Sequence, residues 1–101
     1  MDRLFIDDDR FPPNDGYRWQ IARSFHTAIH MLEQYHYDVI SLDHDIQSFY
    51  GNREMTGYDI LNWMIEHKER FKGVRVVVHS ENWSAVPHMQ QDIDKHFPQK
   101  S

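Results

Sequence analysis

Cysteine is absent from the 101-residue sequence. Disulfide bonds, a thiol nucleophile and a thiolate metal site are therefore all excluded. The sequence also lacks any apolar run long enough to span a bilayer, and Asp2 opens the chain without the apolar stretch of a secretory signal. We therefore expect a soluble, cytoplasmic protein that does not associate with membranes.

Basic residues are also scarce. The 11 lysines and arginines are outnumbered by 16 aspartates and glutamates, which gives a formal charge of −5. This balance argues against the broad basic surface that binds duplex nucleic acid. A small phosphate-containing ligand is compatible with it if clustered carboxylates hold a divalent cation. The length suits one domain, so we expect residues 1–101 to form a single unit.

Short apolar runs alternate with stretches of helical periodicity. Strands are predicted at residues 3–7, 17–23, 39–42 and 74–78, and helices over 25–36, from Thr56 to just before Gly73, and from about Ser84 onward. Strands that alternate with helices in this way indicate a parallel sheet with right-handed crossovers.

Local signals support these boundaries. Ser24 is suited to cap the first predicted helix, and Thr56 with Asp59 resembles a capping box in which Asp replaces Glu. The valines within residues 74–78 favour a strand that is buried on both faces. Residues 43–55 are expected to form a polar loop.

Three of the predicted strands end in side chains that bind metal ions or transfer protons. The C-terminal ends of parallel strands share one edge of the sheet, where ligands bind in open α/β folds. We therefore expect these side chains to converge. They are Asp7, Asp8 and Asp9 after the first strand, Asp43, His44 and Asp45 after the third, and His79 and Ser80 after the fourth.

Carboxylates in such a group are hard oxygen ligands, which suit Mg²⁺ or Mn²⁺. We predict that Asp7, Asp8, Asp43 and Asp45 hold the ion, and that Asp9 faces water. A solvated acidic turn is the alternative for the first cluster, and Asp45 is equally suited to cap the loop backbone.

This arrangement resembles the receiver domains of two-component regulators. In that resemblance Asp7 and Asp8 match the acidic pair, and Asp43 matches the phospho-accepting aspartate. Gly57 corresponds to the glycine that opens the next helix, and Ser80 lies near the hydroxyl residue that follows the fourth strand.

Two features depart from an ordinary receiver, and they resemble one divergent family. The first helix is replaced by a proline-containing loop at residues 10–16, and the fifth strand with its lysine is absent. With these departures the chain resembles the cyclic-phosphate-processing receiver domains. The motifs that carry the resemblance are Asp7-Asp8-x-Arg10, Leu42-Asp43-His44-Asp45, Thr56-Gly57 and His79-Ser80.

The resemblance implies a fold and a reaction. The expected fold is a three-layer, receiver-like (flavodoxin-like) α/β domain with four parallel strands in the order 2-1-3-4. The expected activity is a metal-dependent phosphodiesterase that acts on a cyclic phosphate of a nucleotide or an RNA end. His44 and His79 would transfer protons, Arg10 would bind a phosphoryl oxygen, and Ser80 would hydrogen-bond another.

Alternatives remain for the function and for individual residues. His79 is also compatible with a buried structural histidine. The domain is also compatible with a non-catalytic module that binds a nucleotide or a protein, or that accepts phosphate at Asp43. Trp83 is expected in the core or at its rim, or alternatively beside the site, stacked on a base. Two stripes of polar residues are expected to face solvent, namely His26 with His30, and His88 with Asp92 and His96.

Overall fold

The computed structural model describes residues 2–80 and 82–98. The four predicted strands and three predicted helices are all present, and the third strand has the predicted bounds. In chain order the elements are β1 (Arg3–Ile6), β2 (Trp19–Ala22), α1 (Phe25–Gln34), β3 (Val39–Leu42), β4 (Ser48–Tyr50), β5 (Arg53–Met55), α2 (Gly57–Glu66), the 3₁₀ helix η1 (Lys68–Phe71), β6 (Arg75–Val78) and α3 (Val86–His96). Across these two stretches, no helix combines the length and the apolar character needed to cross a membrane.

The main sheet is parallel, with the strand order β2-β1-β3-β6. This confirms the predicted order, because β6 is the fourth of the strands expected from the sequence. Ile6 pairs with Ala22 on one side and with Leu42 on the other, and Leu42 in turn pairs with Val78. The four strands therefore end at the same level, and the residues that follow them start from one edge.

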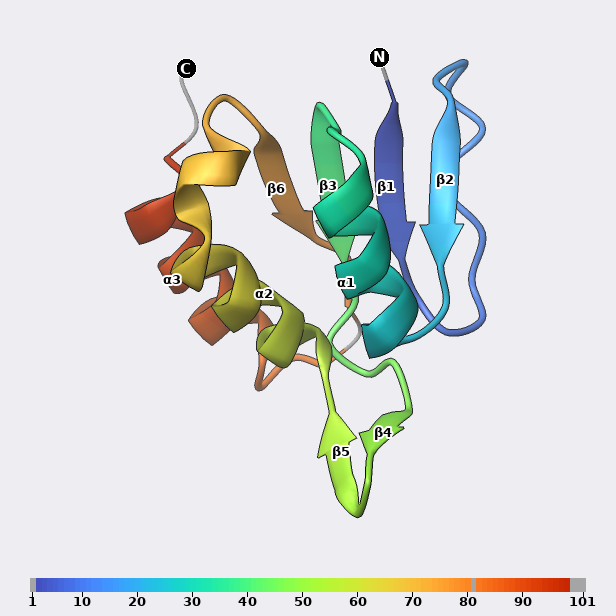
Figure 1. Cartoon of the computed structure of the whole chain (residues 1–101), viewed down its shortest axis with the longest axis vertical. Coiled ribbons are helices and arrows are strands. Elements are labelled where there is room, and N and C mark those ends of the chain that lie inside the picture. Colours follow the sequence, from blue (N-terminus) through green and yellow to red (C-terminus); the bar gives the residue numbers. More distant parts are fainter. Residues whose placement is uncertain (1, 81, 99–101) are drawn as a thin grey trace.

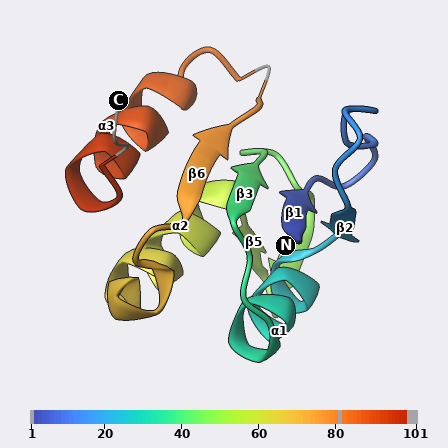
Figure 2. The same cartoon turned by 90° about the horizontal axis from the view of Figure 1, so that it is seen from above.

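The helices cover the two faces of this sheet unequally, as Figures 1 and 2 show. Helices α1 and α2 lie side by side on one face, whereas α3 lies on the other side and packs against β6. Within the described ranges no helix covers β1 and β2 on the side of α3, because residues 10–16 form the predicted loop. The chain thus has the expected three-layer, receiver-like α/β architecture.

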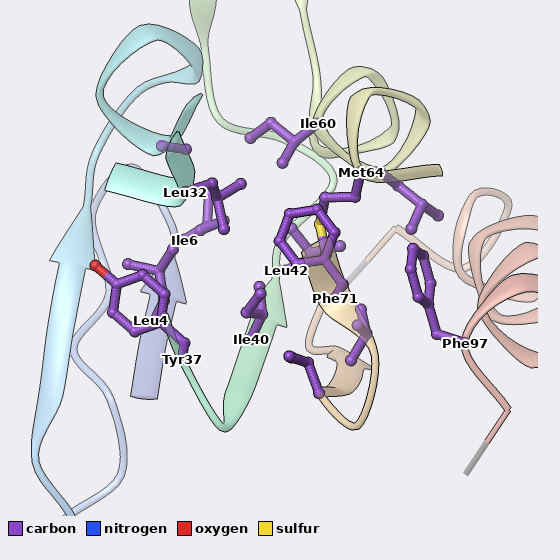
Figure 3. Packing of buried hydrophobic residues seen from close by; sticks show 14 of the residues in the cluster. Leu4, Ile6, Leu32, Tyr37, Ile40, Leu42, Ile60, Met64, Phe71 and Phe97 are labelled. Carbon is purple, nitrogen blue, oxygen red and sulfur yellow. The ribbon is translucent and has the colours of Figure 1, made fainter. Parts of the chain in front are cut away.

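Most of the core lies between the sheet and the pair α1 and α2, and Phe97, at the end of α3, belongs to the same buried cluster (Figure 3). Alternate residues of the central strands point into it, and Leu4, Ile6, Ile40 and Leu42 have no exposed surface. Each such side chain contributes roughly 1.5–3 kcal/mol to folding through its removal from water. The same alternation sends the residues between them to the opposite face.

The predicted helix caps are both formed. The Ser24 hydroxyl accepts a hydrogen bond from the Thr27 amide at 3.2 Å. Thr56 accepts one from the Tyr58 amide at 3.2 Å, and its own amide donates to the Asp59 carboxylate at 2.7 Å. Asp59 therefore completes a capping box in place of the usual Glu or Gln, which fixes where α2 begins.

The prediction of an uninterrupted polar loop at residues 43–55 is wrong. Strands β4 and β5 form an antiparallel hairpin there, which extends beyond the C-terminal edge of the sheet in Figure 1. Gly51, with φ of +63°, lies in its two-residue turn. The buried Ser48 hydroxyl accepts a hydrogen bond from the Phe25 amide at 3.1 Å, which ties the hairpin to the start of α1. The Gly-Asn turn between two short runs was the signal for this hairpin.

Two burial predictions also need correction. Strand β6 is not buried on both faces, because Arg75 is exposed and Val77 is only partly buried. The face that carries them is covered by one helix, whereas Val76 faces the closed core. The stripe on α3 is not wholly solvated either, since Asp92 accepts a hydrogen bond from the Tyr58 hydroxyl of α2.

Candidate functional site

The edge formed by the C-terminal ends of the strands brings Asp7, Asp43 and His79 together. Each is the first residue after its strand, and backbone hydrogen bonds continue the sheet through them. The Asp43 amide donates to the Ile6 carbonyl at 3.0 Å, and the His79 amide donates to the Leu42 carbonyl at 2.8 Å. By strand alternation the three side chains share the face opposite α1 and α2.

Asp7, Asp8 and Asp43 form an acidic group. One carboxylate oxygen from each lies within 4.8 Å of the others. Asp7 has no exposed surface and Asp43 is only 7% exposed, so two of the three charges are screened poorly by water. The structure thus brings together three of the four residues predicted to hold a metal ion.

Asp7 is the most firmly held of these carboxylates. Its Oδ1 accepts hydrogen bonds from the Asp9 and Arg10 amides, each at 3.0 Å, and its Oδ2 lies 3.0 Å from His79 Nε2. Burial alone would raise the pKa of Asp7, but these hydrogen bonds outweigh it and lower the pKa below its ordinary value. Asp7 is therefore an ionised carboxylate in a fixed orientation.

The other two carboxyl groups, those of Asp43 and Asp8, have raised pKa values. Burial, and next the Asp7 charge, raise the pKa of Asp43 despite a hydrogen bond from Ser80. Burial, followed by the charge of Asp9, raises the pKa of Asp8. A divalent cation among these oxygens would relieve the repulsion that contributes to both shifts. The donor set and its electrostatics therefore fit Mg²⁺ or Mn²⁺.

His79 is enclosed by three neighbours. Its ring stacks on Phe5 with centroids 4.2 Å apart, and its Nδ1 lies 2.5 Å from the Ser41 hydroxyl oxygen. Burial lowers the pKa of His79, and the Asp7 carboxylate offsets this only in part. A neutral ring beside the ionised Asp7 places its proton on Nε2, so the Ser41 hydroxyl donates to Nδ1.

His44 has a different environment. Its Nδ1 lies 2.8 Å from Asp45 Oδ1 and 3.2 Å from Asn82 Nδ2, and 19% of its side chain is exposed. Asp45, predicted as a fourth metal ligand, thus has His44 as its partner and is absent from the acidic group. Its assignment as a ligand stays a prediction.

Arg10 and Arg23 add positive charge to the edge. Arg10 is exposed, and its charge adds to the burial that lowers the pKa of His79. Arg23, which follows β2, donates to the carbonyl oxygens of Asp7 at 3.3 Å and of Arg10 at 2.5 Å. These bonds hold the loop after β1 in place.

Gly57 explains how α2 approaches the site. Its amide donates to the His44 carbonyl at 2.8 Å, and a Cβ built on it would lie 1.8 Å from the Asp43 carbonyl oxygen. A side chain cannot fit there unless the backbone moves. The glycine of the Thr56-Gly57 motif therefore sets the position of Asp43.

Sequence reasoning missed Ser41 and Arg23. The strand register contains a signal for each of them. Ser41 is a polar residue two positions before Asp43, so the two side chains share one face of the sheet. Arg23 follows Ala22, the residue paired with Ile6, so it starts from the same edge as Asp7. Two further expectations about exposure have different outcomes. His26 and His30 are exposed, as expected, whereas Trp83 is 89% exposed instead of lying in the core or at its rim.

A separate cavity lies away from this edge. It has a volume of about 550 Å³, and the apolar residues Phe71, Val74 and Phe97 are among those that line it. Lys68 and Lys72 also line it, but it contains none of the motif residues. The cavity is therefore separate from the candidate site at the strand ends.

A family model matches most of the chain. The family model described as "Cyclic-phosphate processing Receiver domain" matches residues 2–95. No curated protein and no solved structure matches the chain. The matched span includes the three strand ends and the loops that carry the candidate site.

Proposed function

The chain belongs to the family of cyclic-phosphate processing receiver domains, and we propose that it is a metal-dependent phosphodiesterase that hydrolyses a cyclic phosphate. The observation that carries this proposal is the convergence of Asp7, Asp8 and Asp43 within 4.8 Å. A proton-transferring histidine, His44, directly follows the last of them in the chain.

Asp7, Asp8 and Asp43 are the residues that would hold the ion. When bound, Mg²⁺ or Mn²⁺ would neutralise the charge of the phosphate diester and lower the pKa of a coordinated water. The fixed orientation of Asp7, set by two backbone amides and His79, favours binding because little freedom is lost. Ser80 performs a similar task for Asp43 through its hydrogen bond.

His44 is the proposed proton carrier. Its Nδ1 has two possible partners. When Nδ1–H donates to Asp45, Nε2 carries no proton and can act as a base. When Nδ1 instead accepts a hydrogen bond from Asn82, the ring proton lies on Nε2. In the hydrolysis a water oxygen bonds to phosphorus, one ring P–O bond breaks, and the water proton passes to Nε2. The leaving oxygen takes a proton from the surrounding water.

His79 and Arg10 take supporting roles. Both ring nitrogens of His79 are occupied, by Asp7 and by Ser41, so its contribution is to orient Asp7. Arg10 is exposed, its charge acts on the same ring, and its guanidinium suits a phosphoryl oxygen.

The test is a panel of cyclic phosphates incubated with protein and Mg²⁺ or Mn²⁺, with products identified by ³¹P NMR. His44→Ala should lose roughly 10²-fold or more in turnover, the usual scale for removal of a general base. His30→Ala, on the exposed face of α1, is the matched control and should keep full turnover. Hydrolysis of no member of the panel, or full turnover in His44→Ala, would contradict the proposal.

Phosphate acceptance at Asp43 is the alternative, and the hydrogen bond from Ser80 to that carboxylate favours it. Incubation with acetyl phosphate followed by intact-mass measurement separates the two functions. A hydrolase should show no adduct. A stoichiometric acyl phosphate that is lost in Asp43→Asn would replace our proposal with the alternative.

A further inference from the structure

Trp83 is the most exposed large hydrophobic side chain in the part of the chain that the structure describes. It is 89% exposed, whereas Trp19 and Trp63 are partly buried and pack against other aromatic rings. An exposed indole gains nothing from the hydrophobic effect in the isolated protein. The Trp83 ring is therefore accessible to a ligand.

Trp83 is held next to the proposed proton carrier. The preceding residue, Asn82, places its side-chain nitrogen 3.2 Å from His44 Nδ1. Its side-chain oxygen accepts hydrogen bonds from the Ser84 and Ala85 amides at 3.2 and 3.0 Å. These contacts fix the backbone turn that carries Trp83 and link that turn to His44.

We propose that Trp83 stacks on the nucleobase of a nucleoside cyclic phosphate whose phosphate lies at the carboxylate group. This inference rests on the proposed function and names its substrate class. Base stacking on an aromatic side chain tolerates any base and needs no basic surface, which this chain of net charge −5 lacks.

The surroundings of Trp83 favour a base over a protein partner. Its neighbours in the chain, Asn82 and Ser84, are polar, whereas the centre of a protein interface is enriched in apolar residues. Phe11, which is 77% exposed on the loop after β1, has one face over the Arg23 guanidinium at 5.1 Å. Trp83 is thus the exposed aromatic residue that directly follows, in the chain, the Asn82 contact with His44.

Steady-state kinetics with two substrates test the inference. Adenosine 2′,3′-cyclic phosphate carries a base, and glycerol 1,2-cyclic phosphate carries the same strained diester without one. Trp83→Ala should raise KM for the nucleotide roughly 5- to 150-fold, the range of base stacking on an aromatic residue, and leave KM for the glycerol ester unchanged. Trp83→Phe, which keeps an aromatic plane, should restore most of the loss.

Tyr35→Ala is the matched control. Tyr35 is 59% exposed at the end of α1, near the opposite edge of the sheet, and its loss should change neither KM. Equal KM values for the nucleotide in wild type and Trp83→Ala would overturn the inference while leaving the proposed hydrolysis intact. A trinucleotide that ends in a 2′,3′-cyclic phosphate shows whether an RNA end is preferred to the mononucleotide, and the same dependence on Trp83 supports the inference for either source.

A binding measurement keeps the inference separate from catalysis. Adenosine 3′-monophosphate with Mg²⁺ should quench the tryptophan fluorescence of wild type and of Tyr35→Ala, and should not quench that of Trp83→Phe. Quenching in wild type that is lost in Trp83→Phe supports stacking even if no cyclic phosphate is hydrolysed. Absence of quenching in wild type, or unchanged quenching in Trp83→Phe, would overturn it.

Discussion

The two faces of the main sheet are built from the same strands and differ in almost every physical respect. On the face under α1 and α2, Leu4, Ile6, Ile40 and Leu42 are closed off from water. The other face carries Phe5, Ser41 and Val77, followed at the strand ends by Asp7, Asp43 and His79. The first face is closed and apolar, whereas the second combines packing against α3 with charge at the strand ends.

This difference explains how a short chain stays folded although its candidate site lowers the free energy of unfolding. Burial, and next the charge of Asp7, raises the pKa of Asp43, and this disfavours the folded state at neutral pH. Burial of the apolar face, to which the preceding residue Leu42 belongs, contributes the folding free energy that offsets this destabilisation. Substitutions on adjacent residues should therefore have opposite effects.

The largest effect is expected from the apolar face. Leu42→Ala removes a side chain with no exposed surface and should lower the free energy of unfolding by about 2–5 kcal/mol. Its neighbour Asp43→Asn should not lower it in metal-free buffer. Urea unfolding followed by circular dichroism measures both. A destabilised Asp43→Asn would mean that the two faces do not differ as described.

The response to a divalent ion comes next. A ligand at a hundred times its dissociation constant stabilises a folded protein by about 2.7 kcal/mol, so Mn²⁺ should raise Tm. Asp8→Asn removes one member of the acidic group and should abolish most of this rise, whereas Asp45→Asn, whose carboxylate pairs with His44, should keep it. A rise lost in Asp45→Asn alone would make Asp45 the ligand and contradict our choice of residues.

Gly57→Ala tests the contact that joins α2 to the charged face. The new Cβ would clash with the backbone of Asp43, and overpacking of this kind costs about 1–3 kcal/mol. Asn62→Ala, at an exposed position of the same helix, should change stability by less than about 0.5 kcal/mol. Thermal unfolding of the two variants measures the difference. Equal stabilities of Gly57→Ala and Asn62→Ala would show that the backbone at Asp43 moves to accept the new Cβ without a loss of stability.

The smallest effect is a pH dependence. Because the pKa of Asp43 is raised on folding, its proton is bound more tightly in the folded state. Its contribution to stability is present below the ordinary value of 3.8 and is lost as pH rises through the raised value. In metal-free buffer Asp43→Asn should therefore raise Tm by a few degrees at pH 7 and by nothing below pH 3.8. The same increase at both pH values would assign the effect to packing instead of charge.

Much of the fold could be predicted because its signals are local. The apolar, β-rich run Val39–Leu42 identifies a strand, Ser24 and Thr56 identify helix starts, and the order of the elements favours a parallel sheet. The hairpin at β4 and β5 was missed although Gly51-Asn52 marks its turn, since its strands have only three residues each. The exposure of Val77 was missed because it depends on which helix covers that face.

The sequence by itself determined which residues gather at the edge of the sheet. Asp7, Asp43 and His79 each follow an apolar strand directly, and parallel strands in register must deliver them to one level. The family motifs are likewise short and local, so the sequence alone carries the resemblance to the family.

Only the tertiary structure decided which partner each of these side chains takes. His79 lies 72 positions after Asp7 and 38 after Ser41, yet it bonds to both. Asp45 could have joined the acidic group, but in the fold it meets His44, while Asp8 completes the group. Such choices depend on side-chain direction across neighbouring strands and on what packs behind them, and a hydrogen bond forms or fails within about half an ångström. Position along the chain does not carry that information.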